Sequence, residues 1–492
     1  MRARRANSAM FTLLALGVCS IALLPWMAQA GGPLLVGGIF GLEGVPFTWD
    51  PAVPAPYRVD GGPLARKRDG TVTVNNATGL ARVQAMFQVW EDVPTASITF
   101  EYGGAIPSTG LFTDGDVSTV EEFNAVAAAC IEGTVSPILF DADGTIFQDL
   151  TGDTAIFGFA GPCRLDLLTG RILSGLGMFN GRMRDGIDTP TSYPPNYEMP
   201  AAEFDETLAH EFGHFAGLDH SQLNTEVMTQ TYPNCRVDDL AGLPVMFPYA
   251  VCQAKSVAGL PMLAPDDLAW ISMLYPETVD APPNQIPFAR RYATIRGTIL
   301  FSDEVTHVQG LNVIARDTLQ PRRIAVSVWA GYLFTSWPGQ TVTGDNDLGS
   351  GFGSRNPLLI GAFDIPVPAG SYHVWVESVS PFFGGSPMGP LFPPIPNPGR
   401  DEYWNTNESA TDSVTEKTAI TIAAGEERAD INIILNGTPP RFDSFESAQL
   451  WLHEPFDAWR REEDALPYAR EPWRVTRPRE GGDPPLPCAG DA

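Results

Sequence analysis

One stretch of the chain, HEFGHFAGLDH beginning at His210, contains residues whose types and spacing suit metal chemistry. His210 and His214 are four residues apart, so on a helix they share one face and can bind one zinc ion. Glu211 would lie beside such a metal, where it can accept a proton from a bound water. Gly217 can take the left-handed conformation that ends a helix, which lets the chain turn back and bring in His220 as a third ligand.

This stretch and the residues just before it also predict a helix with a buried face. Phe204, Leu208, Phe212 and Phe215 fall on one side of this helix, away from the two histidines. A structural helix that happens to be rich in histidine is the alternative interpretation. The chain has six histidines, and the only three between the N-terminal apolar segment and residue 291 belong to this stretch, which favours the metal site.

The extended pattern H-E-x-x-H-x-x-G-x-x-H resembles the signature of the metzincin metallopeptidases, and its continuation GLDHS is similar to the matrixin branch. AMFQVWEDV and PDDLAWISMLYP are similar to an early and a closing helix of that family, so the resemblance covers most of residues 45–276. It implies an α+β fold with a twisted sheet over the active-site helix. It also implies one catalytic Zn2+ in a cleft that binds extended peptide, with Glu211 as the general base.

Metzincins also have a methionine turn beneath the zinc, and the chain offers two candidates for it. Met228 has the matrixin spacing from His220, but its context, VMTQ, matches the family poorly. Met246 lies in LPVMFPY, which is closer to the family pattern, and it is the candidate that we favour. Residues 224–243 then form an insertion. Core packing is the alternative role of either methionine.

The stretch SPILFDADGTIFQDLTGD resembles the matrixin calcium loop and predicts a possible Ca2+ site. The candidate oxygen ligands are Asp141 and Asp143, with Asp149 or Asp153 as additional ones. Gly144 permits the tight turn that such a loop needs. An Asx turn with solvated carboxylates is the alternative interpretation.

The N-terminus predicts export from the cell. An arginine-rich start is followed by FTLLALGVCSIALLPWM and by the small-residue triplet AQA, which is typical of a secretory signal peptide cleaved after Ala30. An uncleaved membrane anchor is the alternative interpretation, which Pro25 and the cleavage triplet disfavour. No later stretch has the roughly eighteen apolar residues that span a bilayer, so we expect no membrane insertion.

The net charge of -27 disfavours nucleic acid as a partner. In an oxidising compartment, the sequence suggests the disulfides Cys130–Cys163 and Cys235–Cys252, which leaves Cys488 in the tail unpaired.

The chain divides into five parts by composition. The signal peptide, residues 1–30, precedes the matrixin-like domain, residues 31–276. A proline-rich linker, residues 277–291, leads to a region of short β-rich runs, residues 292–437, which predicts an all-β sandwich domain. This region resembles the transthyretin-like or carboxypeptidase-regulatory-like domains of secreted hydrolases. Residues 438–492 form a tail of unknown role.

Together these features predict a multidomain, secreted zinc endopeptidase that hydrolyses peptide bonds in proteins through a zinc-bound water activated by Glu211. The partner of the β-rich region stays unknown. The alternative function is a secreted peptide-binding or adhesion protein whose zinc domain is not catalytic. Glu211 favours the enzyme, because binding alone does not require a base beside the metal.

Overall fold

The fold comes from a computed structural model of the chain. The structure describes residues 31–38, 40–108, 115–152, 156–189, 196–231, 234–278, 284–334, 353–354, 356–379 and 397–436. The predicted signal peptide, the predicted tail, Cys488 and Asp153 lie outside these residues.

A five-stranded sheet forms the centre of the N-terminal half. Its strands follow the order β4-β1-β5-β7-β6. They are β1 (Ala55–Val59), β4 (Phe100–Ala105), β5 (Pro137–Asp141), β6 (Gly158–Asp166) and β7 (Arg171–Asn180). All neighbouring pairs are parallel except β6 with β7, so the edge strand β6 runs against the rest of the sheet. A short antiparallel pair, β2 (Ala65–Arg66) and β3 (Val72–Val74), lies beside this sheet.

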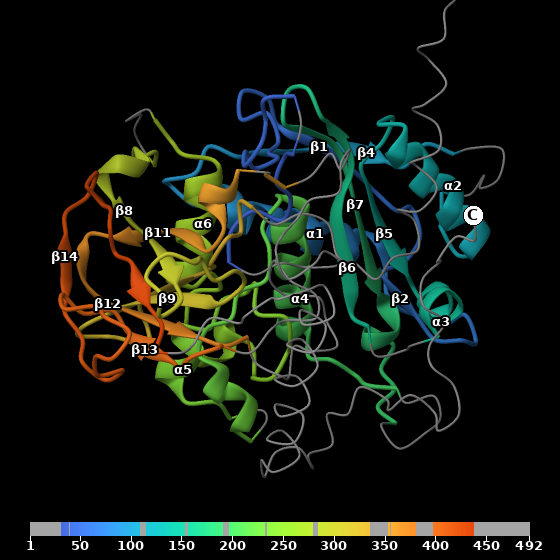
Figure 1. Ribbon diagram of the computed structural model, residues 1–492. Helices are drawn as coiled ribbons and strands as arrows, with labels where there is room; N and C mark the ends of the chain where they lie inside the picture. The colour runs from blue at the N-terminus through green and yellow to red at the C-terminus, as the bar shows by residue number, and fades with distance from the viewer. Residues whose placement is uncertain are drawn as a thin grey trace, which may run out of the picture.

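Helices cover both faces of this sheet (Figure 1). On one side lie α1 (Asn76–Glu91) and α4 (Ala201–Phe215), and on the other α2 (Val120–Ile131) and α3 (Thr145–Thr151). Two further helices, α5 (Val237–Ala241) and α6 (Pro265–Leu274), follow α4 in the chain. Single turns of 3-10 helix are η2 (Gly181–Arg184), η3 (Thr225–Thr229), η4 (Lys255–Ala258), η5 (Phe288–Arg290) and η6 (Pro357–Leu359). This mixture fits the α+β catalytic domain that the sequence predicts.

The sequence signals explain where α1 begins and what it buries. Asn75 caps the helix, since its side-chain oxygen accepts the N–H of Thr78 at 2.9 Å. Val83, Phe87 and Trp90 are buried at helical spacing. The ring of Phe87 stacks on Phe212 of α4, with 3.8 Å between the ring centroids, so α1 and α4 pack against each other on one face of the sheet.

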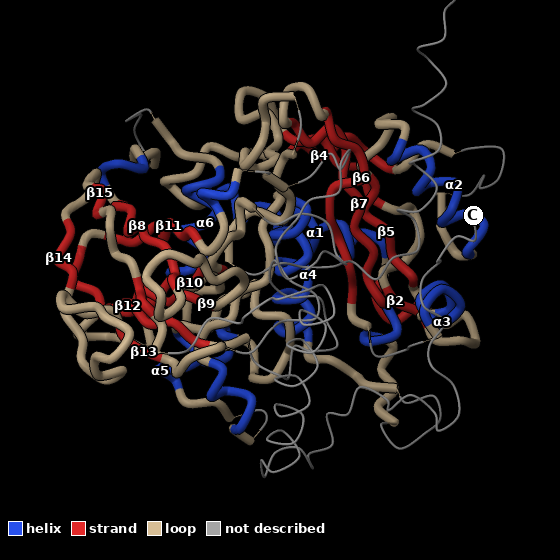
Figure 2. The backbone as a smooth tube through the Cα atoms, viewed as in Figure 1, coloured by secondary structure: helices blue, strands red, loops and turns tan. Residues whose placement is uncertain are grey.

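The described parts of residues 292–436 form two further sheets. The larger has the order β10-β9-β12-β13, with β14 also paired to β12, and the other has the order β11-β8-β15, with β16 paired to β8. The strands are β8 (Tyr292–Leu300), β9 (Asn312–Asp317), β10 (Ala325–Trp329), β11 (Ala362–Pro368), β12 (Gly370–Glu377), β13 (Glu402–Tyr403), β14 (Ile420–Ile422), β15 (Glu427–Arg428) and β16 (Ile433–Ile434). In Figure 2 these strands form a group of their own, and α4 lies between them and the first sheet.

One hydrophobic cluster nevertheless joins the two halves of the chain. It includes Phe212 of α4 and Trp270 of α6 together with Val328 of β10 and Ile365 of β11. The indole N–H of Trp270 donates to the carbonyl of Ser327 at 2.8 Å, so a hydrogen bond joins α6 to β10. The α2 and α3 face of the first sheet has a separate cluster that contains Cys130.

Two disulfides confirm the pairings that the sequence suggests. Cys130 at the end of α2 bonds to Cys163 in β6, which ties the helix to the edge strand. Cys235 bonds to Cys252, which closes the segment that contains α5 and Met246.

Candidate metal centre

The helix α4 positions the first two histidines. Its apolar face, with Phe204, Leu208, Phe212 and Phe215, has no measurable solvent exposure. Because this face is fixed against α1 and the sheet, the side chains on the neighbouring faces of the helix have fixed directions as well.

Gly217 turns the chain at the end of α4. Its φ of +92° lies in the left-handed region, where a side chain would be strained. The N–H of Gly217 donates to His214 O and that of Leu218 to Gly213 O, which closes the end of the helix. The turn therefore brings His220 back to the two helical histidines.

The three imidazoles converge on one point. The Nε2 atoms of His210, His214 and His220 are 3.2, 3.1 and 3.2 Å apart in the three pairs. In the described part of the chain these residues form the one group of at least three side chains whose ligand atoms lie close enough to share a metal ion. Tetrahedral zinc with Zn–N bonds of about 2.0–2.1 Å requires nitrogens about 3.3 Å apart, so the three atoms fit zinc.

The second ring nitrogens determine which tautomer two of the histidines adopt. His210 Nδ1 lies 2.7 Å from Val245 O, and His214 Nδ1 lies 2.9 Å from Leu218 O. A carbonyl accepts only from an N–H, so both Nδ1 atoms hold the proton and both Nε2 atoms keep a free lone pair. His220 Nδ1 is buried and has no hydrogen-bond partner among the described residues.

Burial keeps all three histidines neutral. It lowers the pKa of His210 to about 4, and burial together with the proximity of His210 lowers the pKa of His214 to about 3. The pKa of His220 also falls well below its ordinary value, because of burial and the proximity of His214 and His210. Only the neutral imidazole is a metal ligand, so the site is prepared to bind a cation at neutral pH.

Glu211 lies on α4 next to His210 and is 7% exposed. Burial raises the pKa of its carboxyl to about 8, and a hydrogen bond with the backbone of Ala160 in β6 opposes the shift. Gly158 in the same strand also borders this side chain, because a methyl group at position 158 would lie 3.3 Å from Glu211 Cγ. Glu211 is therefore held between α4 and the edge strand.

Met246 packs against α4 between the first two histidines. A methyl group added to Gly213 would lie 2.2 Å from Met246 Sδ, so the glycine allows this close approach. Met246 is 2% exposed. Met228, the other candidate for the methionine turn, is half-buried in η3.

Sequence reasoning missed Asp267, which holds this turn from α6. Its carboxylate accepts the backbone N–H groups of Val245 at 2.8 Å and Met246 at 3.2 Å, and also that of Ala264 at 2.7 Å. The signal in the sequence is APDD, in which the second acid reaches back to the residue before the helix.

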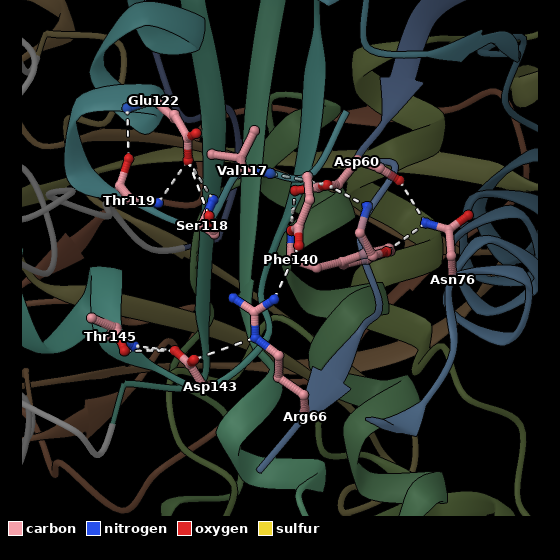
Figure 3. A network of polar contacts seen from close by, with 12 residues as sticks. Asp60, Arg66, Asn76, Val117, Ser118, Thr119, Glu122, Phe140, Asp143 and Thr145 are labelled. Carbon is pink, nitrogen blue, oxygen red and sulfur yellow. Dashed lines mark hydrogen bonds and ion pairs between the residues drawn. The ribbon is translucent and has the colours of Figure 1, made fainter. Parts of the chain in front are cut away.

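Two of the predicted calcium ligands, Asp141 and Asp143, already have partners among the described residues. Asp141 Oδ2 accepts the N–H of Phe147 at 2.7 Å, at the start of α3. Asp143 Oδ2 accepts from Arg66 Nε at 3.3 Å, and Figure 3 shows the guanidinium of Arg66 directed at this carboxylate. Asp149 is exposed on α3. A guanidinium neutralises a carboxylate that a calcium site would need, so the structure gives the calcium prediction no support.

Comparison with known proteins agrees with the geometry at the histidines. Residues 69–247 match the family model of the matrixins. This segment includes the three histidines, Glu211 and Met246. The match supports a matrixin-like metallopeptidase domain with a catalytic zinc, and a zinc-dependent endopeptidase type of function that acts on protein or peptide substrates. Matrixins are typically extracellular proteins.

Other comparisons add little to the matrixin-like domain. None of the curated proteins matches the chain. Among solved structures, the chain is similar to a leucine-rich repeat protein from Bacteroides thetaiotaomicron at 10% identity, over 31% of this chain, with a TM-score of 0.14. The match spans 15% of that protein's chain, and a likeness of this size carries no argument. Among the described residues, no helix has the length and apolar character needed to cross a membrane.

Proposed function

We propose that this chain is a secreted zinc endopeptidase in which His210, His214 and His220 bind the metal and Glu211 is the general base. The observation that carries the proposal is the convergence of three neutral Nε2 atoms within 3.1–3.2 Å of one another, beside a buried carboxylate that the helix α4 presents.

In the mechanism, bound zinc would polarise a scissile carbonyl and lower the pKa of a water. The chain supplies the proton transfer. Glu211 accepts a proton from the attacking water and then passes it to the leaving amine. Its carboxyl is buried, with a pKa raised to about 8, and this pKa would be lower beside a bound cation. The group is therefore able to exchange a proton near neutral pH.

Met246 is the proposed methionine turn. The support is its contact with α4 at Gly213 and the two hydrogen bonds by which Asp267 fixes the backbone at Val245 and Met246. Because Val245 O also accepts from His210 Nδ1, the turn orients the imidazole of His210.

We further propose the division of the chain that the sequence predicts: a signal peptide (residues 1–30), a catalytic domain (31–276), a linker (277–291), a β-sandwich domain (292–437) and a tail (438–492). The separate sheets on either side of the linker support the two central boundaries. The two disulfides support export, because disulfides persist in oxidising compartments.

The test is incubation of the exported protein with a peptide library, with and without a zinc chelator, followed by mass spectrometry of the products. Cleavage that the chelator abolishes supports the peptidase. Peptide binding without any cleavage would instead support the alternative, a binding or adhesion protein.

A further inference from the structure

The loop that carries His220 is covered by the β-rich region. Residues 221–224 are each at most 1% exposed, although they follow directly after a candidate metal ligand. The side chain of Leu223 packs in a small cluster with Ile314 of β9 and Ala325 of β10. The loop is therefore buried by strands that lie much later in the chain.

A closed set of hydrogen bonds holds the middle of the loop. Asn312, the first residue of β9, donates from Nδ2 to Gln222 O at 3.0 Å and to Glu377 Oε1 at 2.9 Å. Gln222 Nε2 donates to the same carboxylate oxygen at 2.8 Å. Both the backbone and the side chain of Gln222 are thus fixed by β9 and β12.

The two ends of the loop are held in the same way. The hydroxyls of Ser221 and Ser327 in β10 are 2.9 Å apart. Asn224 has a left-handed φ of +50°. Its side chain donates to Arg322 O at 2.7 Å and accepts from Arg316 at 2.9 Å. These contacts stabilise a backbone conformation that a residue other than glycine rarely adopts.

The third histidine depends on this loop more than the other two do. His210 and His214 belong to α4, and each has a backbone carbonyl at Nδ1 that orients its ring. His220 lies beyond the helix, and its buried Nδ1 has no such partner among the described residues. The position of its ring therefore depends on the backbone of the loop, which the N–H of Ser221 also bonds to Met246 O at 2.9 Å.

We propose that Asn312 and Ser327 of the β-rich region are positioning residues for the metal centre, which act through the loop at residues 221–224 on His220. The proposal rests on the proposed function, because it takes the three histidines as ligands of zinc. On this view the β-rich region completes the metal centre and is more than an appended module.

The test compares Asn312→Ala with Asn405→Ala in the full chain, each loaded with cobalt(II) in place of zinc. Asn405 is a matched control, because it is 1% exposed, against 0% for Asn312, and donates to Asp412 at 2.7 Å within the β-rich region. Two quantities are measured: the visible absorption of the bound cobalt and its rate of transfer to a chelator. Thermal unfolding of each variant shows the general loss of stability.

We expect Asn312→Ala to release cobalt roughly tenfold faster than the parent and to change its visible spectrum, as outer-shell changes at metal sites do. Ser327→Ala, which removes a single hydroxyl, should act in the same direction by roughly two- to threefold. Asn405→Ala should leave both quantities as in the parent even where it lowers the melting temperature. If Asn312→Ala does not fold, Ser327→Ala decides.

Spectra and release rates that equal those of the parent in all three variants would overturn the positioning role. A parent protein that binds no cobalt or zinc at all would instead overturn the proposed function, so the two failures are distinguishable.

Discussion

The carbonyl oxygen of Val245 lies 2.7 Å from His210 Nδ1. The N–H of the same residue donates to Asp267, so a single peptide segment connects the first histidine to the buried acid of α6. The orientation of the imidazole therefore depends on a turn that lies 35 residues further along the chain.

Replacement of Glu211 by alanine should separate catalysis from metal binding. Glu211 is not among the three side chains whose ligand atoms converge, so the variant should keep about one zinc per chain. Peptide cleavage should fall at least about a hundredfold, as is typical when a general base is lost. Metal analysis and cleavage kinetics of the same sample check both statements. Parent-like cleavage would assign the activity to another site or to a contaminant.

His214→Ala is the companion variant. It removes a ligand whose Nε2 lies 3.1–3.2 Å from both other histidines, so zinc content and cleavage should fall together. Retention of a full equivalent of zinc in this variant would contradict the assignment of the ligands.

The dialysed protein should contain one zinc per chain. The described residues provide one group of side chains that can share an ion, and that group has three histidines. Elemental analysis of a sample of known concentration measures the ratio. Two equivalents would reveal a second, structural site.

Gly213→Ala should destabilise the protein through overpacking. The added methyl group would meet Met246 Sδ at 2.2 Å and Trp90 Cζ2 at 3.0 Å, inside a buried helix face. The cost expected for such crowding is about 1–3 kcal/mol, seen as a melting temperature lower by a few degrees. Gly103→Ala is the control, because its nearest neighbours would be 3.5 Å away, an ordinary contact.

Asp266→Asn should change how stability depends on pH. Burial and the neighbouring Asp267 raise the pKa of Asp266 to about 8, against hydrogen bonds from Ser327 and Ser221. The folded state then holds the proton more tightly than the unfolded chain, where the pKa is about 3.9. This contribution to the free energy of unfolding is complete below pH 4 and is lost as the pH rises towards 8.

The asparagine variant should therefore lose less stability than the parent between pH 5 and pH 8, because its amide does not titrate. It keeps an oxygen that can accept the N–H of Ser327, which is 2.7 Å from Asp266 Oδ1 in the parent. Melting temperatures over this pH range measure the difference. Parallel curves for parent and variant would show that Asp266 is ionised throughout.

The features that could be predicted from the sequence are the ones that local spacing determines. The histidines at i and i+4, the glycine that ends α4 and the buried face of α4 each depend on a few neighbouring residues. The structure brings His210, His214 and His220 together for this reason. The disulfides also follow from cysteines that are close in sequence, separated by 33 and 17 residues.

The contacts that could not be predicted join residues far apart in the chain. Two adjacent acids at the start of α6 usually indicate a solvated helix end, yet Asp266 and Asp267 are at most 2% exposed. The partner of Asp266, Ser327, lies in a strand whose register depends on the whole fold, and Asp267 accepts from the distant turn at Val245 and Met246. The calcium prediction failed to gain support for a similar reason, since Arg66 is 77 residues away from Asp143.

The hydrophobic cluster that runs from α4 through α6 into β10 and β11 has a thermodynamic consequence. Two modules joined only by a flexible linker melt independently, whereas a common core makes their unfolding cooperative. Calorimetry of the intact chain should then show one dominant transition. A metal ion that binds only the native state would raise the temperature of that transition for the C-terminal sheets as well, through mass action.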